Sequence, residues 1–347
     1  MGRGGARHPL VELTLARVRE FFREPEAIFW AFVFPLVLTL ALAAAFPSAA
    51  DRQAIVGLVD AAKAPEIQRA LEAAPGLRVV PLAAADERRA LRDGTVHIVV
   101  VPGDPPTYRY DPSKGESPRA RLAVDDALKR GAGRADPWTA AEERVAVPGS
   151  RYVDWLIPGL IGMGIMTNGL WAVAFPIVNA RLRKLLKRMM ASPMQRWEYL
   201  LAQMLARLIF LVPEATLPLA FGSLALGMPI AGSYAGIALV VLVGALAFGA
   251  MGLLLGSRAR TIEAASGLVN AFQLPMWLLS GVFFSSANFP AALQPVIHAL
   301  PLTALNNALR TVVLDGAGAA AVWRELALLS AWGVVSFGLA LRLFRWR

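Results

Sequence analysis

The sequence predicts a membrane protein that is all-α within the membrane, with six transmembrane helices and an α/β domain inserted between the first two. Only 17% of the 347 residues are charged and 56% are hydrophobic, whereas soluble domains carry about 25% charged residues. After residue 150, apolar runs long enough to cross a hydrocarbon layer alternate with short clusters of Arg and Lys. Between residues 51 and 150, short β-branched runs alternate with helix-like segments instead.

The net charge of +10 is not spread evenly along the chain. Residues 51–150 hold 15 basic and 15 acidic side chains, so the basic excess lies beside the apolar runs. That distribution follows the positive-inside rule of membrane proteins and is not that of a nucleic-acid-binding face. The chain has no cysteine, which excludes disulfides, thiolate nucleophiles and zinc thiolate sites.

Residues 1–27 are expected to form a cytoplasmic interfacial segment before the first transmembrane helix. Within 8–24 the apolar side chains fall near one side of a helix and the arginines largely around the other, which is typical of a helix lying on a membrane surface. The first crossing is expected at 28–46, with Pro35 inside it. A secretory signal peptide is the alternative, because residues 48–50 resemble a cleavage site. The long, glutamate-containing segment before the apolar run favours a retained anchor.

Residues 47–152 are expected to form the α/β domain, outside the cytoplasm. The strand-like runs QAIVGLVD, LRVVPL and TVHIVVVP are separated by the helix-like APEIQRALEAA and AADERRALRDG. Such alternation is typical of a compact α/β unit, and about 100 residues can form a core of their own. GESPRARLAVDDALKRG predicts one more helix, and EERVAVP a return strand.

Residues 153–347 are expected to form a transmembrane domain of five helices. The apolar runs that predict them lie at about 155–178, 200–226, 234–255, 264–284 and 326–343. Residues 288–314, before the last run, are too apolar for an ordinary loop and too broken by prolines for another crossing. We expect a pair of short re-entrant helices there, because irregular backbone at membrane depth needs protein or water around it.

The basic connectors predict the orientation. With six crossings, the arginines and lysines of the N-terminal segment, of the second-to-third and fourth-to-fifth connectors and of the C-terminal tail all fall on one side. The third-to-fourth connector, GMPIAGS, carries no charge. By the positive-inside rule both termini are cytoplasmic and the α/β domain is extracytoplasmic, in a multi-pass protein of the cell inner membrane.

Three stretches together resemble one transporter family. They are LARVREFFREPEAIFWAFVFPLVL, the basic, Ser-Pro-containing RKLLKRMMASPMQRWEYLLAQMLARL, and LPMWLLSGVFFSSANFPAALQPVIHALPLTALNNALRTVVLDG. Their order and spacing are similar to those of ABC-2 type permeases of ABC exporters, in the group with a large extracytoplasmic domain between its first two spans. The chain departs from the family where NARLRKLLKR stands in place of a run that often contains Glu.

The resemblance implies two protein partners: a separate ABC ATPase subunit and a second permease, either a copy of this chain or a paralogue. The sequence contains no G-x-x-x-x-G-K-[ST] phosphate loop, so it does not bind ATP in the usual way. We therefore expect no ATPase site, no enzymatic activity and no cofactor in the chain itself. The energy would come from the separate subunit or from an ion gradient.

The contact with the ATPase is expected at residues 179–198. This segment combines a basic, helix-forming stretch with a Ser-Pro pair at which a helix can stop and restart. The alternative role for its cations is to anchor the ends of spans to anionic lipid headgroups. The residues assigned to coupling are Arg183, Lys184, Lys187, Arg188, Ser192 and Pro193.

Glu214 is the most conspicuous residue inside an expected crossing. It follows Leu200 by 14 positions, which is about 21 Å along a helix and hence near mid-membrane. A charged carboxyl there costs about 2.5–3.5 kcal/mol on insertion scales, so Glu214 is expected to face the protein interior or to be protonated. It is either a polar point on the translocation path or a neutral side chain hydrogen-bonded to a neighbouring helix.

Five further polar residues are assigned more weakly. Asn168, Asn270 and Gln273 are candidates for the same path, with hydrogen bonding between helices as the alternative. Glu263, at the expected cytoplasmic end of the fifth span, is a gate residue or a member of a surface ion pair. Arg310, in the re-entrant segment, caps an outer gate or anchors the segment at the interface.

Other function classes leave weaker traces in the sequence. An intramembrane hydrolase would need clustered ligands or a nucleophile with its base, but the three histidines at 8, 97 and 298 are isolated. A secondary transporter would predict paired internal repeats, and none is evident. A membrane-anchored sensor or structural protein with an extracytoplasmic ligand-binding domain stays open, and an ATPase gene beside this one would count against it.

Overall fold

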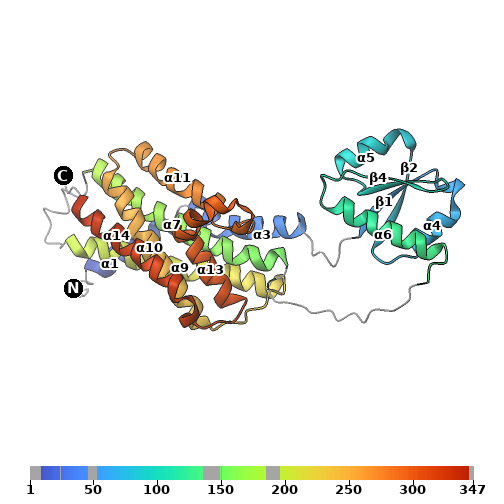
Figure 1. Cartoon of the computed structure of the whole chain (residues 1–347). Coiled ribbons are helices and arrows are strands. Elements are labelled where there is room, and N and C mark those ends of the chain that lie inside the picture. Colours follow the sequence, from blue (N-terminus) through green and yellow to red (C-terminus); the bar gives the residue numbers. More distant parts are fainter. Residues whose placement is uncertain are drawn as a thin grey trace, which may run out of the picture. The chain divides into compact units, whose positions relative to one another are not determined.

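The computed structural model is mostly helical and divides into two compact units. The first unit comprises Met1–Phe46 and Ala146–Arg347, and the second comprises Pro47–Val145 (Figure 1). The structure describes residues 9–23, 25–45, 53–135, 149, 151–184 and 196–343.

The second unit is built on a four-stranded sheet with the strand order β2-β1-β3-β4. Strand β1 pairs in parallel with β2 and β3, and β4 pairs antiparallel to β3. The three strands expected from the sequence are therefore present, whereas the short edge strand β4 was not expected. The strands are β1 Ala54–Val59, β2 Leu77–Leu82, β3 Ile98–Val101 and β4 Thr107–Arg109.

Helices cover both faces of this sheet (Figure 1). On one face, α4 (Pro65–Glu72) and α6 (Glu116–Gly131) enclose Val56 and Leu58 of β1. On the other face, α5 (Glu87–Asp93) packs near Val59 of the same strand. Because successive side chains of a strand point to opposite faces, a two-sided core needs apolar residues at consecutive positions. The run AIVGLV supplies them.

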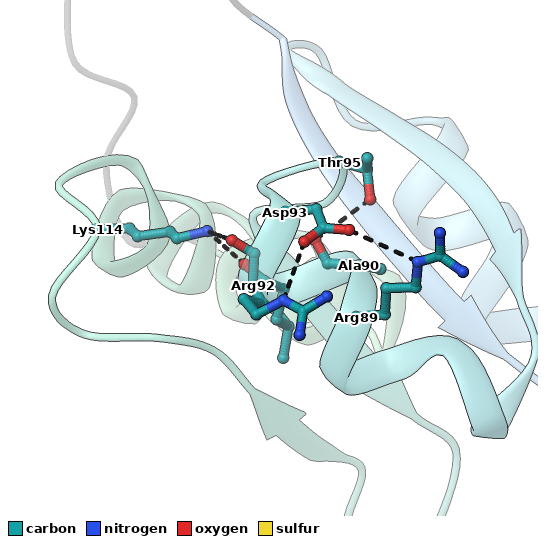
Figure 2. A network of polar contacts seen from close by, with 7 residues as sticks. Arg89, Ala90, Arg92, Asp93, Thr95 and Lys114 are labelled. Carbon is teal, nitrogen blue, oxygen red and sulfur yellow. Dashed lines mark hydrogen bonds and ion pairs between the residues drawn. The ribbon is translucent and has the colours of Figure 1, made fainter.

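A cation closes the carboxyl end of α5 in this unit (Figure 2). The Nζ of Lys114 donates to the backbone carbonyls of Leu91 and Arg92, the latter at 2.8 Å. Asp93 in the same turn pairs with Arg92 at 3.0 Å and with Arg89 at 3.7 Å. The last carbonyls of a helix have no partner within it and carry the negative end of its dipole. Lys114 therefore stabilises α5 by its charge as well as by hydrogen bonds.

The first unit is a bundle of helices. Its elements are α1 Pro9–Phe22, α2 Pro25–Ile28, a π-helical turn Phe29–Val33, α3 Phe34–Ala45, α7 Tyr152–Leu182, α9 Arg196–Ala225, α10 Tyr234–Arg258, α11 Ile262–Leu279, α12 Gln294–Ala299, α13 Pro301–Val313 and α14 Trp323–Leu343. The start of α1 and the end of α14 lie at the same end of the bundle (Figure 1). Helix α1 packs against α9, with the rings of Phe22 and Phe210 6.0 Å apart.

By length and composition, four of the described helices can cross a membrane. They are Tyr152–Leu182, Leu205–Ala225, Tyr234–Arg258 and Ala319–Leu343. At the expected first crossing stands a shorter apolar helix, Phe29–Ala45. At the expected fifth, α11 ends at Leu279 and not at residue 284, because Gly281 adopts a left-handed conformation (φ +68°) that closes the helix. The six-span arrangement stays a prediction.

The sequence places the boundary between the units at residue 152, and that boundary stays a prediction. By its internal contacts the second unit ends at Val145, and Ala146 onward groups with the helix bundle. Arg151 shows why: its Nη1 donates to the carbonyl of Leu226 at 3.0 Å and its Nη2 to that of Gly227 at 2.9 Å. These bonds tie the start of α7 to the end of α9 within the bundle. The expected return strand, EERVAVP, falls outside the described residues.

The centre of the bundle is a close contact between α7 and α10. A Cβ added at Gly252 would lie 2.5 Å from the carbonyl oxygen of Gly169, and one at Gly256 would lie 2.9 Å from the Cα of Ala174. These glycines allow the two backbones to touch, as small residues do where membrane helices pack. Residues 288–314 contain two short helices, α12 and α13, and their re-entrant course stays a prediction. Leu302, Leu305 and Leu309 of α13 are fully buried against the bundle core.

Candidate functional site

A buried ion pair lies within α9. The Nη1 of Arg207 is 2.5 Å from the Oε2 of Glu214, and the two side chains are 8% and 3% exposed. They are seven positions apart, which is nearly two helical turns. They therefore lie on the same face of α9, about 10.5 Å apart along its axis. Pro213 stands between them in the sequence. Two long side chains can close that distance where shorter ones would not.

Helix α7 completes the surroundings of this pair. The Nδ2 of Asn168 donates to the Oε1 of Glu214 at 2.8 Å, and the Nη2 of Arg207 donates to the carbonyl of Ile165 at 3.2 Å. A Cβ at Gly164 would lie 3.2 Å from the same Oε1, so the missing side chain leaves room for the carboxylate. We call Asn168, Arg207 and Glu214 the buried polar cluster.

The cluster satisfies most of its own hydrogen-bonding groups. Each carboxylate oxygen of Glu214 accepts one bond, whereas the Nε of Arg207 has no acceptor within the described part of the chain. A buried carboxylate and guanidinium neutralise each other, and removing either one leaves a charge that the apolar surroundings do not compensate. The cluster therefore offers a pair of opposite charges and an amide within the helix bundle.

The other two candidates for the path, Asn270 and Gln273, lie on α11, away from this cluster. Gln273 is buried and accepts a hydrogen bond from the Nε1 of Trp171 at 2.8 Å, so it links α11 to α7. Asn270 is half-buried and forms no hydrogen bond with any described residue. Two of the four sequence-predicted path residues, Asn168 and Glu214, thus meet in one cluster, and Gln273 takes part in a separate contact between helices.

The expected coupling segment is described only in part. Arg183 follows the end of α7 and donates to the Oδ1 of Asn179 at 3.0 Å. Lys184 has a left-handed backbone (φ +54°) and is exposed. Just before them, Arg181 donates to the carbonyl of Ala259 at 2.7 Å, which ties the ends of α7 and α10 together. Lys187, Arg188, Ser192 and Pro193 lie outside the described residues.

The two residues assigned to gates have contrasting environments. Glu263 is exposed in the first turn of α11 and forms no ion pair with a described residue, so the expected surface pair with its basic neighbours is not present there. A carboxylate in the first helical turn is favoured by the helix dipole. Arg310 is 7% exposed on α13 and contacts Trp155 and Gly281.

Arg207 is the residue that the sequence analysis missed. Its signal is present in the sequence: it is an arginine inside an apolar run, seven positions before Glu214, on the face that a period of 3.6 residues assigns to both. A charged residue within such a run usually has a partner facing the protein interior. No group of three or more His, Cys, Asp or Glu that could hold a metal ion occurs among the described residues.

A sequence model of the family described as "ABC-2 family transporter protein" matches residues 25–342. The chain belongs to the ABC-2 transporter family. The match includes the buried polar cluster, α13 and the whole second unit. The family resemblance inferred from three stretches of the sequence is thereby confirmed.

Individual relatives of this ABC-2 chain carry transporter names. The probable multidrug ABC transporter permease YbhR of Escherichia coli K12 is 29% identical over 180 residues, which cover 52% of this chain and 49% of the relative. The inner membrane transport permease YhhJ of the same strain is 31% identical over 120 residues, or 35% and 32% of the two chains. ABC transporter G family member 20 of Dictyostelium discoideum is 22% identical over 187 residues, or 53% and 26%. The matches span about half or less of each relative's length.

Proposed function

We propose that the chain is the transmembrane permease subunit of an ATP-driven ABC exporter and that a separate ABC ATPase subunit hydrolyses the ATP. Membership of the ABC-2 family carries this proposal. The names of the bacterial relatives, both called permeases, support it. The absence of a phosphate loop from the sequence agrees with a division of labour between subunits.

In this proposal six helices cross the inner membrane. The four long apolar helices would be joined by Phe29–Ala45 and by α11, with α12 and α13 dipping in from the outer side. An even number of crossings places both termini on one side, and the positions of α1 and α14 at one end of the bundle support this (Figure 1). The basic connectors favour the cytoplasm for that side, so the second unit would be extracytoplasmic. Two permeases, identical or paralogous, would form the exporter.

The buried polar cluster is proposed as a polar point beside the translocation path. The observation that favours this role is the position of a full ion pair inside an apolar bundle, where a purely structural contact could be made by apolar side chains at no greater cost. Asn270 and Gln273 are proposed to line the same path from α11. Glu263 is proposed at its cytoplasmic end.

Coupling to the ATPase is proposed for residues 179–198. The contact of Arg181 with the end of α10 supports this, because a push on the end of α7 would reach α10 through that side chain. The residues proposed to meet the ATPase are Arg183, Lys184, Lys187, Arg188, Ser192 and Pro193.

A reconstitution experiment tests the proposed function. The full-length permease is co-expressed with an ABC ATPase encoded beside it, and the two are purified in one complex by a tag on the permease alone. We expect ATP-dependent accumulation of a fluorescent amphiphile in proteoliposomes, and we expect its loss when the phosphate-loop lysine of the ATPase is replaced. Transport that continues at the normal rate without nucleotide hydrolysis would contradict the proposal, as would a permease that binds no ATPase.

A further inference from the structure

Arg310 of α13 is a buried cation held by two other segments of the bundle. Its Nε and Nη2 each lie 3.3 Å from the carbonyl oxygen of Trp155, and its Nη2 also donates to the carbonyl of Gly281 at 2.5 Å. The guanidinium carbon lies 3.5 Å from the centre of the Trp155 ring. Trp155 belongs to α7 and Gly281 closes α11, so one side chain joins three elements that are far apart in the sequence.

Among the described residues, no carboxylate balances the charge of Arg310. Three described carboxylates are buried, Glu87, Asp154 and Glu214, and each forms an ion pair with an arginine of its own. The pairs are Glu87 with Arg109, Asp154 with Arg151, and Glu214 with Arg207. The contrast with Arg207 is direct, because both arginines are more than nine-tenths buried and only Arg207 has an acidic partner within the described chain.

The groups that do contact Arg310 offset its burial only in part. Backbone carbonyls and an aromatic face are dipoles and quadrupoles, which attract a cation without neutralising it. Gly281 stands at the carboxyl end of α11, where the helix dipole contributes a fraction of a negative charge. A buried charge that has no counter-ion is costly to retain, and these contacts leave a net positive charge in the bundle.

One nitrogen of the guanidinium has no acceptor in the described part of the chain. The Nη1 of Arg310 donates no hydrogen bond to any described residue, whereas Nε and Nη2 both do. A Cβ at Gly281 would lie 3.6 Å from Nη1, so the glycine that closes α11 also leaves this nitrogen without a side chain beside it from position 281. The N–H groups of Nη1 are therefore the donors that a further acceptor could use.

We propose that Arg310 binds one anionic group, a phosphate or a carboxylate, through its Nη1. Guanidinium is suited to this because its N–H groups form charge-assisted hydrogen bonds with phosphate or carboxylate oxygens and because it stays charged when buried. The anion supplies the counter-charge that the described residues do not supply. Its source is either the headgroup of an anionic lipid or an anion dissolved in water. The inference concerns binding alone and goes beyond the proposed export function, so either can fail without the other.

Binding is tested with the purified full-length chain in two arms. In the first, nanodiscs of phosphatidylcholine are compared with nanodiscs that also contain phosphatidylglycerol, and lipids that remain bound are counted by native mass spectrometry. In the second, inorganic phosphate is titrated into phosphatidylcholine nanodiscs and its dissociation constant is measured by calorimetry. Retention of phosphatidylglycerol alone identifies a lipid headgroup, and saturable binding of phosphate alone identifies a soluble anion. Binding in neither arm overturns the proposal.

The variants assign the binding to Arg310. Arg310→Gln is expected to raise the dissociation constant of the anion about tenfold or more, because a charge-assisted hydrogen bond is lost. Arg324→Gln is the matched control: Arg324 also stands over a tryptophan ring, that of Trp323 at 5.6 Å, but it is exposed. The control is expected to bind as the wild type does. Equal binding by Arg310→Gln and the wild type would reduce Arg310 to a helix-capping role and overturn the inference.

A second measurement covers the case in which Arg310→Gln does not fold. Hydrogen exchange of the wild-type chain is followed along α13 with and without the anion identified above. Bound anion is expected to slow exchange at Pro301–Val313 and to leave α14 unaffected, because the anion would hold the side chain that ties α13 to its neighbours. Unchanged exchange in α13 at saturating anion would refute the site without any variant.

Discussion

Removing one member of the Arg207–Glu214 pair should destabilise the helix bundle strongly. In Glu214→Gln the amide can still accept the hydrogen bond from Asn168, so the shape and one contact are kept while the charge of Arg207 is left without its partner. Breaking a buried pair in this way costs about 3–5 kcal/mol. At about 1.4 kcal/mol for each factor of ten, the equilibrium constant for unfolding at a fixed denaturant concentration should rise by about two to three and a half orders of magnitude.

The assay is equilibrium unfolding of the full-length chain in mixed micelles, followed by circular dichroism as the fraction of denaturing detergent is raised. Glu263→Gln serves as the control, because that carboxylate is exposed on α11 and has no ion pair with a described residue. Its loss should move the midpoint far less, because an exposed charge in the first helical turn interacts only weakly with the helix dipole. The double variant Arg207→Met, Glu214→Leu should recover most of the lost stability, because both charges leave together. A cost below about 1 kcal/mol for Glu214→Gln would show that the pair is not a buried ion pair.

Three further predictions test the packing of the bundle and the polar contacts of the second unit. Lys114→Met should lower the stability of the second unit by about 1 kcal/mol, measured by thermal unfolding, because the end of α5 loses its cation. Gly252→Val should disrupt the bundle, since its Cβ would meet a carbonyl of α7 at 2.5 Å, whereas Gly249→Val, with open space around it, should be tolerated in the same assay. The hydrogen bond from Lys129 lowers the pKa of the Asp125 carboxyl, so its contribution to stability is present above the unfolded pKa and is lost as pH falls through the folded value. In a plot of the free energy of unfolding against pH, Asp125→Asn should therefore lose less stability than the wild type as the pH falls.

Most of the local structure could be predicted from the sequence, because period and length are properties of neighbouring residues. The three strands of the second unit follow from apolar runs of four to six residues, and α7 and α10 from runs too long for a soluble core helix. The edge strand β4 could not be found in this way. Its three residues, Thr107–Arg109, show no apolar run, and they form a strand because Val100 offers Tyr108 an open edge.

The candidate site was predicted less completely, because its contacts join residues that the sequence separates. The depth of Glu214 follows from its place in an apolar run. The bond from Asn168 bridges 46 positions and depends on the packing of α7 against α9. Helical period alone puts Arg207 on the face of Glu214, but Pro213 lies between them and removes one backbone hydrogen bond. Only the three-dimensional course of α9 decides whether two side chains so placed meet.

The two buried arginines show where such inference ends. Arg207 and Arg310 both stand in apolar segments, and by sequence each calls for a compensating group. In the structure Arg207 finds a carboxylate on its own helix, whereas Arg310 finds backbone carbonyls and an indole ring on other elements. The two side chains are buried to a similar extent. The net charge of each arginine with its contacting groups differs by one unit, because only Arg207 contacts a carboxylate. Hydropathy reports only the cost of burying a charged group, so it treats the two residues alike. Within the described chain, however, a carboxylate neutralises Arg207 and none neutralises Arg310.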